Sequence, residues 1–108
     1  MKKGEIWLID LPEGKGHEQK GQRPGLVIAS SEGITLTIPL TSNADRYQLT
    51  YTEIIEQTPE NKLSCDSIAL IFQLSAVDNS RFIRQMGSIT SEKQKVIDDH
   101  LKSMLKIQ

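Results

Sequence analysis

Residues 14–24, which read GKGHEQKGQRP, concentrate the side chains of this chain that could do chemistry. His17 changes charge near neutral pH and Glu18 is a carboxylate, so both could move protons. Arg23 carries a planar guanidinium that can bind two oxygens of a phosphate at once. A core cannot absorb so many polar groups, so the stretch is predicted to be a surface loop that carries a site. The alternative is a plain solvated connection between two strands.

Strand-like runs lie on both sides of this loop. Residues 5–10 are mostly apolar with polar ends, and residues 26–29 form a short, continuous apolar run typical of a central strand. Pro24 disfavours the helical region for Arg23 and favours an extended backbone. Residues 30–33 then predict a turn into the alternating run 34–38, which gives the clearest hairpin of the chain.

The second half of the chain predicts further strands and one helix. Residues 49–55 and 67–73 are expected to be strands, with 81–83 beside the latter before a break at Gly87. Ser91 is the expected N-cap, with Gln94 completing a capping box. The apolar face of this helix comprises Ile97, Leu101, Met104 and Leu105. The predicted fold is mainly β with a C-terminal helix, a compact antiparallel sheet or small barrel.

The length and composition of the chain exclude several classes of protein. The 108 residues are predicted to form a single domain, 1–108, and no window approaches the roughly 18 apolar residues of a membrane span. The net charge of −1 excludes a bulk polycation, so nucleic-acid binding would depend on local charge. A single cysteine, Cys65, excludes an internal disulfide and, with two histidines, argues against structural zinc. We expect no cofactor, no secretory signal and a cytoplasmic location.

Four motifs in a fixed order resemble the MazF/PemK family of toxin endoribonucleases from type II toxin–antitoxin systems. They are GEIWLIDL, GHEQKGQRPGLVI, IPLTSN and DSIALIFQLSAVDNSRF, followed by the terminal helix. The resemblance implies an SH3-like or CcdB-like β-barrel, a homodimer and a cognate antitoxin. It also implies metal-independent, sequence-selective cleavage of single-stranded RNA that leaves a 2′,3′-cyclic phosphate and a 5′-hydroxyl.

Two positions depart from the family pattern. His17 stands where family members most often have a small residue, commonly serine. Lys20 precedes Gly21 where a pair of glycines often follows the Glu-Gln pair. Neither change removes a residue usually assigned to chemistry, but both alter the polarity and the protonation options of the loop.

The resemblance implies a catalytic set of Arg23, Thr41 and Glu18. Arg23 would stabilise charge on the phosphorane, Thr41 would donate to a phosphate oxygen, and Glu18 is a candidate base for the 2′-OH. Because side chains alternate along a strand, only one of Thr41 and Ser42 is expected to face the site. The expected RNA-binding residues are His17, Gln19, Lys20, Gln22, Ser42, Gln73 and Arg81, and no metal ligand is expected.

Each of these roles has a structural alternative. Arg23 could pair with Glu18 as a loop clamp, Thr41 could satisfy backbone groups, and His17 could contact RNA rather than act as the base. Gln73 could be structural, Trp7 could stack a base or pack in the core, and Arg81 and Arg84 could contact phosphates or solvate an edge.

Two other function classes remain open at this point: a CcdB-like toxin that poisons DNA gyrase by binding alone, and a catalytically silent SH3-like interaction module. Neither requires the set of Glu18, Arg23 and Thr41.

Overall fold

The computed structural model describes residues 1–11, 21–43, 45, 47 and 49–107. Its described strands are β1 (Glu5–Leu11), β2 (Gly21–Ser31), β3 (Ile34–Thr41), β4 (Thr52–Ile55), β5 (Ser67–Leu70), β6 (Ser75–Asp78) and β7 (Phe82–Ser88). Short 3-10 turns, η2 (Ile71–Gln73) and η3 (Asn79–Arg81), precede β6 and β7. The chain then forms one long helix, α1 (Ser91–Leu105).

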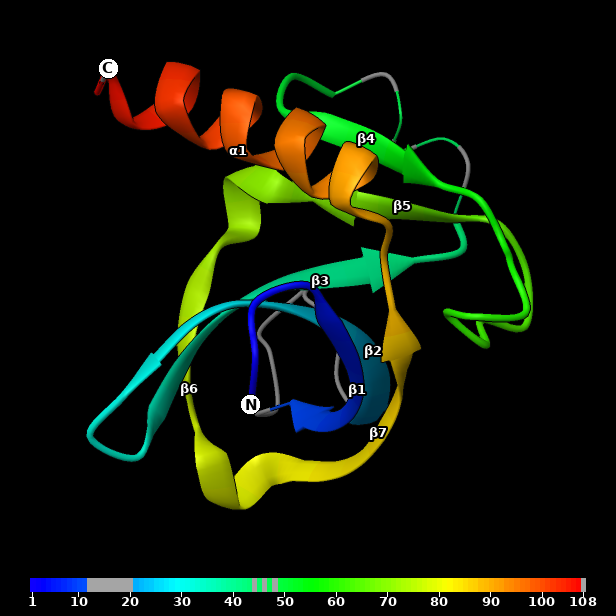
Figure 1. Cartoon of the computed structure of the whole chain (residues 1–108), viewed down its shortest axis with the longest axis vertical. Helices are drawn as coiled ribbons and strands as arrows, with labels where there is room; N and C mark the ends of the chain where they lie inside the picture. Colours follow the sequence, from blue (N-terminus) through cyan, green and yellow to red (C-terminus); the bar gives the residue numbers. More distant parts are fainter. Residues whose placement is uncertain (12–20, 44, 46, 48, 108) are drawn as a thin grey trace.

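The strands form one antiparallel sheet that curls on itself. Its order is β4-β5-β3-β2-β1-β7, and β6 pairs with the first half of β3. Figure 1 shows β1, β2, β3, β6 and β7 drawn as a ring, with α1 beside β4 and β5 on one side of it. This arrangement confirms the predicted fold class, a mainly β chain with a C-terminal helix and a small barrel-like sheet.

The surface loop predicted over residues 14–24 needs correction at its end: β2 begins at Gly21, so residues 21–24, Arg23 among them, belong to a strand. Leu11 of β1 pairs with Gly21 of β2, so these two residues bracket residues 12–20, which lie outside the described residues. Further along β2, the predicted hairpin to β3 is confirmed: Ser31 pairs with Ile34. Glu32 and Gly33 both have positive φ, 55° and 79°, as a two-residue type I′ turn requires.

β3 changes its partner in the middle, and this change opens space beside Arg23. Its pairing with β2 ends at Gly25 and Pro39, after which Leu40 pairs with Ala69 of β5. Pro24 and Pro39 have no N–H to donate, so the ladder between β2 and β3 cannot continue normally at this point. A Cβ on Gly25 would meet the side chains of Ile9 and Thr37, so only glycine allows the strands to approach this closely.

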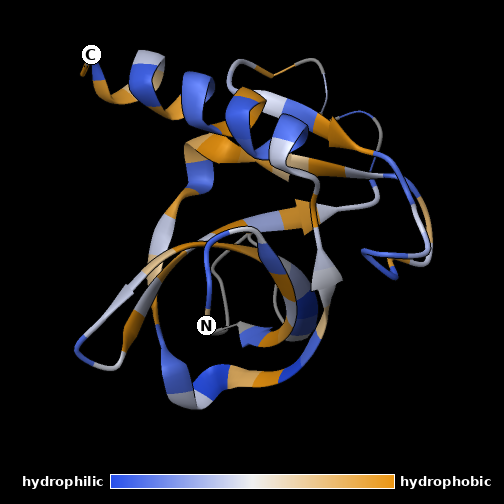
Figure 2. Cartoon of the chain, viewed as in Figure 1, coloured by the Kyte–Doolittle hydropathy of each residue, from blue (hydrophilic) through white to orange (hydrophobic). Residues whose placement is uncertain are grey.

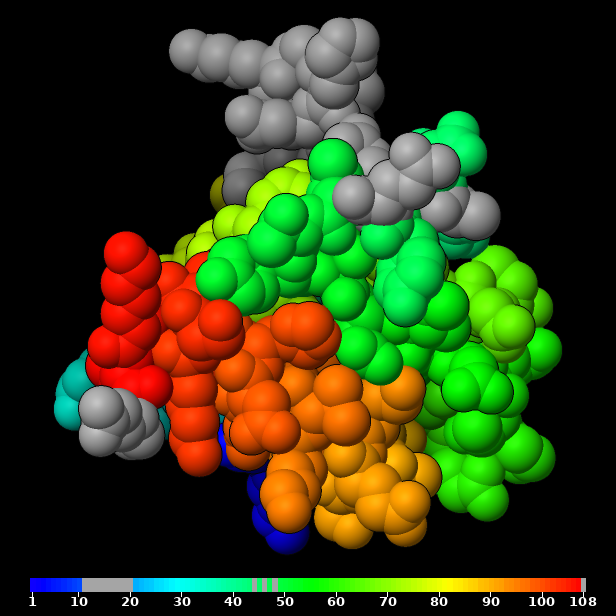
Figure 3. Space-filling model, turned by 90° about the horizontal axis from the view of Figure 1, so that it is seen from above, coloured from blue at the N-terminus to red at the C-terminus, as the bar shows by residue number. Residues whose placement is uncertain are grey.

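The core fills the space between the sheet and the helix. Its buried residues are Ile6, Leu26, Ile38, Leu40, Ile55, Leu63, Ala69, Ile71, Ile97 and Leu101. The last two belong to α1, whose other positions are largely hydrophilic, as the alternating colours of the helix in Figure 2 show. Figure 3 shows α1 lying alongside the green stretch that contains β4 on the molecular surface.

The helix begins one residue away from the expected cap. Thr90, not Ser91, is the N-cap: its backbone is extended and its hydroxyl accepts a hydrogen bond from the backbone N–H of Lys93 at 3.1 Å. Thr90 and Ser91 are adjacent hydroxyl residues, and the capping-box spacing to Gln94 favoured the wrong one. Lys93 occupies the position where a capping box would need Glu or Gln, so the structure has a single cap bond.

Three strand predictions need correction. The strand predicted over 49–55 starts at Thr52, because Tyr51 has a φ of 60° that a strand cannot accommodate. The strand predicted over 67–73 ends at Leu70, and Ile71–Gln73 is a 3-10 turn. Residues 81–83 do not pair beside it: β7 begins at Phe82, pairs with β1 and continues through Gly87. β6 was not predicted, and its pairing with β3 is set by contacts distant in sequence.

Candidate functional site

A hollow of about 390 Å³ opens where β2 and β3 separate. Its described lining comes from β1, β2, β3, β7 and the segment that leads into β5. The lining residues are Leu8, Arg23, Pro24, Leu40, Ser42, Lys62, Leu63, Ser64, Cys65, Ser67, Arg84 and Met86. We call it the cationic hollow, because its described lining contains Arg23, Lys62 and Arg84 and no carboxylate.

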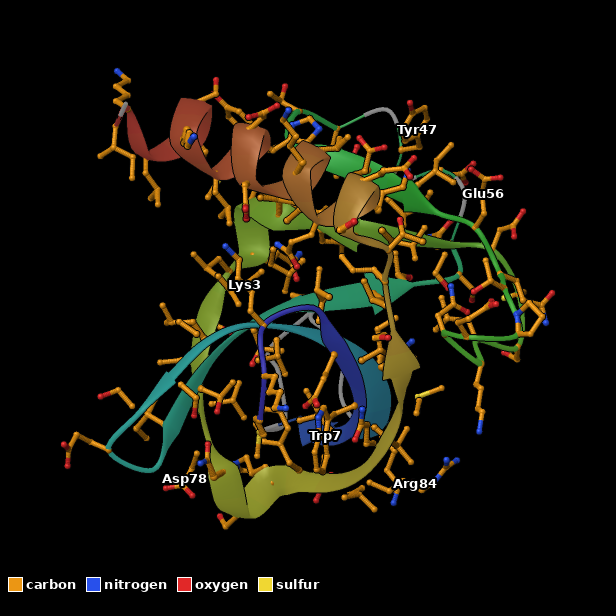
Figure 4. The ribbon with its side chains drawn as sticks, in the orientation of Figure 1. Lys3, Trp7, Tyr47, Glu56, Asp78 and Arg84 are labelled. Carbon is orange, nitrogen blue, oxygen red and sulfur yellow. The ribbon has the colours of Figure 1, made fainter. Side chains whose placement is uncertain are left out.

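This charge pattern suits an anion with several oxygens. Two guanidinium groups can each bind two oxygens of a phosphate, and an ammonium adds a compact positive charge. Serine hydroxyls at 42, 64 and 67 add donors, while Leu8, Pro24 and Leu40 give the hollow an apolar part. Figure 4 shows the labelled side chain of Arg84 projecting away from β7. The described lining therefore has the composition of a site for a phosphate attached to an organic group.

Arg23, which lines the cationic hollow, has a buried hydrogen-bond donor without a partner in the described part of the chain. It is half-buried on β2, and its Nε is buried without a hydrogen-bond acceptor among the described residues. A buried donor without a partner costs free energy, and such atoms in folded proteins call for an explanation such as a ligand. In the cationic hollow, a bound anion would bring acceptor oxygens to the guanidinium group of Arg23.

Thr41 and Ser42 take different places. Thr41 is the last residue of β3 and pairs with Ile68 of β5, two residues beyond the end of the pairing between β3 and β2. Thr41 is only 3% exposed, and its hydroxyl accepts a hydrogen bond from the backbone N–H of Asn43 at 3.2 Å. Ser42 is exposed and lines the cationic hollow, which Thr41 does not. The structure thus brings Ser42 to Arg23's hollow and buries the neighbouring threonine.

The other predicted RNA-binding residues lie outside the lining of the cationic hollow. Gln22 is exposed on β2 opposite Asp10, and Gln73 is exposed at the end of η2. Arg81 is exposed in η3, and its Nη1 donates to the backbone oxygen of Asp10 at 3.5 Å. The remaining predicted site residues lie outside the described residues: His17, Glu18, Gln19 and Lys20.

Trp7 is held by two neighbours rather than lining the hollow. Its indole N–H donates to Glu5 Oε1 at 2.9 Å, and its ring meets that of Phe82 edge-on at 6.0 Å. Burial raises the pKa of Glu5, but hydrogen bonds from the backbone N–H of Lys2 and from Trp7, together with nearby positive charge, outweigh burial and leave the pKa lowered. The only tryptophan therefore joins β1 to β7.

Sequence reasoning missed Lys62. The segment around it predicted only a polar loop, and no motif distinguishes this lysine from the other exposed ones. Within the described part of the chain, no group of three or more His, Cys, Asp or Glu residues is arranged to hold a metal ion. Nor is any described helix long and apolar enough to cross a membrane.

A family model for the "PemK-like, MazF-like toxin of type II toxin-antitoxin system" matches residues 2–105. The chain belongs to this toxin family. A curated relative, Endoribonuclease MazF9 of Mycobacterium tuberculosis, is 26% identical over 113 aligned residues, which cover 94% of this chain and 93% of the relative. The family assignment thus extends over nearly the whole toxin.

Solved structures of other toxins share the fold. MazF of Deinococcus radiodurans superposes with a TM-score of 0.74 at 23% identity, covering 96% of this chain and 94% of the other. The Mycobacterium tuberculosis toxin MazF-mt6 gives a TM-score of 0.76 at 13% identity, with 96% and 98% covered. A MazE–MazF complex of Deinococcus radiodurans gives 0.69 at 24% identity, with 97% and 94% covered. At these identities the likeness supports the toxin fold.

Proposed function

We propose that this toxin is an endoribonuclease that cleaves single-stranded RNA in the cationic hollow. The observation that carries the proposal is Arg23, whose buried Nε lacks an acceptor among the described residues and which lines a hollow with Lys62 and Arg84. A phosphodiester supplies acceptor oxygens and negative charge at the same place. The curated relative named as an endoribonuclease supports the same activity.

The proposed reaction needs no metal. The 2′-oxygen attacks the adjacent phosphorus while its proton passes to a base, and the bond from phosphorus to the 5′-oxygen breaks. That oxygen takes a proton from an acid, and the products are a 2′,3′-cyclic phosphate and a 5′-hydroxyl. Arg23 binds the non-bridging oxygens, whose charge increases in the phosphorane. A guanidinium has a pKa above about 12, so Arg23 serves as an electrostatic group rather than as the base.

The remaining roles divide between the loop and the end of β3. Glu18 is the proposed base, and His17 contacts RNA or takes that role instead. Ser42 offers a hydroxyl within the hollow, whereas Thr41 would act from a buried position next to it. Comparing Ser42→Ala with Thr41→Val identifies which hydroxyl the reaction uses. A pH profile of His17→Ser decides whether a histidine titrates in catalysis.

The proposed RNA substrate and antitoxin fit the positive charge of the hollow, whereas the proposed homodimer follows from the family alone. The substrate is single-stranded messenger RNA, cut at a preferred sequence in the cytoplasm. A cognate antitoxin would inhibit by placing an acidic, disordered segment across the cationic hollow, where three cations meet no carboxylate in the described lining. Solved complexes of related toxins with their antitoxins support such a partner. We further propose that the toxin is a homodimer.

The test is cleavage of a labelled single-stranded RNA by purified protein in EDTA. We expect Arg23→Ala to lower kcat/KM at least about 100-fold, as removal of a transition-state donor does in other enzymes. The matched control is Lys95→Gln, an exposed charge on α1 outside the hollow, which should cleave like wild type. The 5′ fragment should resist phosphatase until acid opens its cyclic phosphate.

Three results would overturn the proposal. Equal cleavage rates for wild type and Arg23→Ala would show that RNA is not cleaved through Arg23 in the cationic hollow. A requirement for a metal ion would contradict the proposed metal-free reaction. Complete lack of cleavage, with gyrase inhibition instead, would favour the CcdB-like alternative. No described observation favours that alternative or the silent interaction module.

A further inference from the structure

Lys62 stands between two hollows. Besides the cationic hollow, it lines a neighbouring hollow of about 380 Å³ together with Gln57, Thr58, Pro59 and Leu63. Lys62 and Leu63 belong to both linings, so the two hollows adjoin along these residues. Each volume falls within the range of roughly 300–1,000 Å³ that is usual for small-ligand sites.

The backbone around Lys62 is held in an unusual conformation. Lys62 has a φ of 54°, which is uncommon for a residue with a side chain. Asn61 is 2% exposed, and its Oδ1 accepts from the backbone N–H groups of Thr58 and Leu63, both at 3.1 Å. Its Nδ2 donates to the backbone oxygen of Glu56 at 2.7 Å. These bonds compensate for the strained backbone, so the turn has a defined shape.

The turn is also docked on the barrel. The backbone N–H of Ser88 donates to the carbonyl oxygen of Glu60 at 3.3 Å, and a Cβ on Gly87 would collide with that oxygen. Leu63, next to Lys62, is 3% exposed and belongs to the core. Lys62 is therefore placed in a fixed relation to β7, the strand that carries Arg84.

The end of the Lys62 side chain is available for a ligand. The residue is exposed, and its Nζ has no hydrogen bond or ion pair within the described part of the chain. By contrast, Lys3 and Lys93 are each paired with a carboxylate at 3.0 Å. An unpaired ammonium on a rigid turn, beside a hollow already lined by two arginines, is placed to bind a second phosphate.

The neighbouring hollow has the composition of a base site. Pro59 and Leu63 offer apolar surface for the face of a ring, and Thr58 and Gln57 offer polar groups at its edge. The Gln57 side-chain amide has no partner among the described residues, whereas its backbone N–H donates to Asp66 Oδ1 at 2.7 Å. Amide groups can both donate to and accept from base edges.

We propose that Lys62 is a substrate-positioning residue that binds the phosphate next to the scissile one, with the adjoining base in the neighbouring hollow. The inference rests on the proposed endoribonuclease function. It names which residue extends the site beyond Arg23. Lys62 acts on the ground state and the transition state alike, so its loss weakens substrate binding without slowing the chemical step.

The test uses Lys62→Gln and Lys62→Arg, with Lys95→Gln as the matched control. We expect Lys62→Gln to raise KM about 5- to 10-fold at low salt with kcat within about twofold of wild type, and Lys62→Arg to restore most of the loss. The slope of log affinity against log salt should fall by about 0.7, the value for one contact to a single strand. Lys95→Gln should change neither quantity.

A second measurement changes the substrate and combines this change with Lys62→Gln. Chimeric DNA oligonucleotides with one ribonucleotide at the cleavage site carry a neutral methylphosphonate in place of each flanking phosphate in turn. One such substitution should raise the KM of wild type as much as Lys62→Gln does, and it should add nothing further in Lys62→Gln.

The outcomes separate the inference from the function. If Arg23→Ala is inactive while Lys62→Gln has the KM and salt slope of wild type, the positioning role is wrong and the endoribonuclease proposal stands. A fall in kcat at unchanged KM would also overturn positioning. Additive effects of methylphosphonate and Lys62→Gln at every position would contradict the proposed phosphate contact. If wild type cleaves no RNA, the function fails and the inference fails with it.

Discussion

The carbonyl oxygen of Glu60 lies against the Cα of Gly87, in the space that a Cβ would occupy. A Cβ there would also stand 2.7 Å from the Cα of Asn61, closer than real Cβ atoms come to backbone. The contact joins the turn that carries Lys62 to β7, which carries Arg84. The position of Lys62 relative to β7 thus depends on the absence of a side chain at Gly87.

Gly87→Ala is therefore expected to displace the turn. The overpacking should lower the free energy of unfolding by about 1–3 kcal/mol, since backbone on both sides has to move. If the turn positions RNA, the KM for cleavage should rise about 3- to 10-fold as Lys62 leaves its place. Urea unfolding and steady-state kinetics on the same preparation measure the two effects.

Gly33→Ala is the matched control for this prediction. Gly33 has a φ of 79°, and a Cβ added to it would meet no atom within 4 Å, so alanine costs about 1–2 kcal/mol through backbone strain alone. It lies in the turn between β2 and β3 and lines neither hollow. Its KM should equal that of wild type. If the KM of Gly33→Ala also rises, the effect of Gly87→Ala on KM comes from general destabilisation and not from displacement of the turn.

Thr90→Ala should destabilise α1 at its start. The hydroxyl of Thr90 satisfies the backbone N–H of Lys93, and loss of such a cap costs about 1 kcal/mol. Ser91→Ala should be neutral or slightly stabilising, because Ser91 is the first helical residue and alanine favours helix. Chemical denaturation of both variants measures the difference. A larger cost for Ser91→Ala would reverse the assignment of the cap.

Glu5 is expected to make stability depend on pH. Its pKa in the folded protein is lowered from the ordinary value of 4.5 despite the opposing effect of burial, so its charged form is stabilised by folding. That stabilisation is fully present above about pH 4.5 and is lost as the pH falls through the folded-state pKa. Glu5→Gln should therefore lower stability by about 0.5–1 kcal/mol at pH 7 and by little at pH 3.

The measurement is the Tm of wild type and Glu5→Gln between pH 7 and pH 3. Trp7→Phe removes one of the two hydrogen-bond donors to Glu5 Oε1. In the Trp7→Phe background, Glu5→Gln should therefore change the Tm at pH 7 less than it does in wild type. If the difference in Tm between wild type and Glu5→Gln stays constant down to pH 3, the charge of Glu5 does not stabilise the fold.

The sequence predicted what depends on local patterns. Alternation of apolar and polar residues predicted the hairpin from β2 to β3, and the periodic apolar face predicted α1. The density of polar groups before Pro24, with the resemblance of four motifs, singled out Arg23, which lines the hollow. The errors fell where local signals compete: two adjacent hydroxyls at the helix start, and Tyr51, whose left-handed backbone keeps it out of the strand that its residue type favours.

By itself, the amino-acid sequence determined the family and the fold class and singled out Arg23 as a candidate, because motifs and periodicity are properties of neighbouring residues. Only the tertiary structure placed Lys62 and Arg84 beside Arg23 and put Ser42, rather than Thr41, at the surface of the hollow. These placements depend on the partner change of β3 at Pro39 and on the contact between Glu60 and Gly87. Both are contacts between residues far apart in the chain, and no local pattern encodes them.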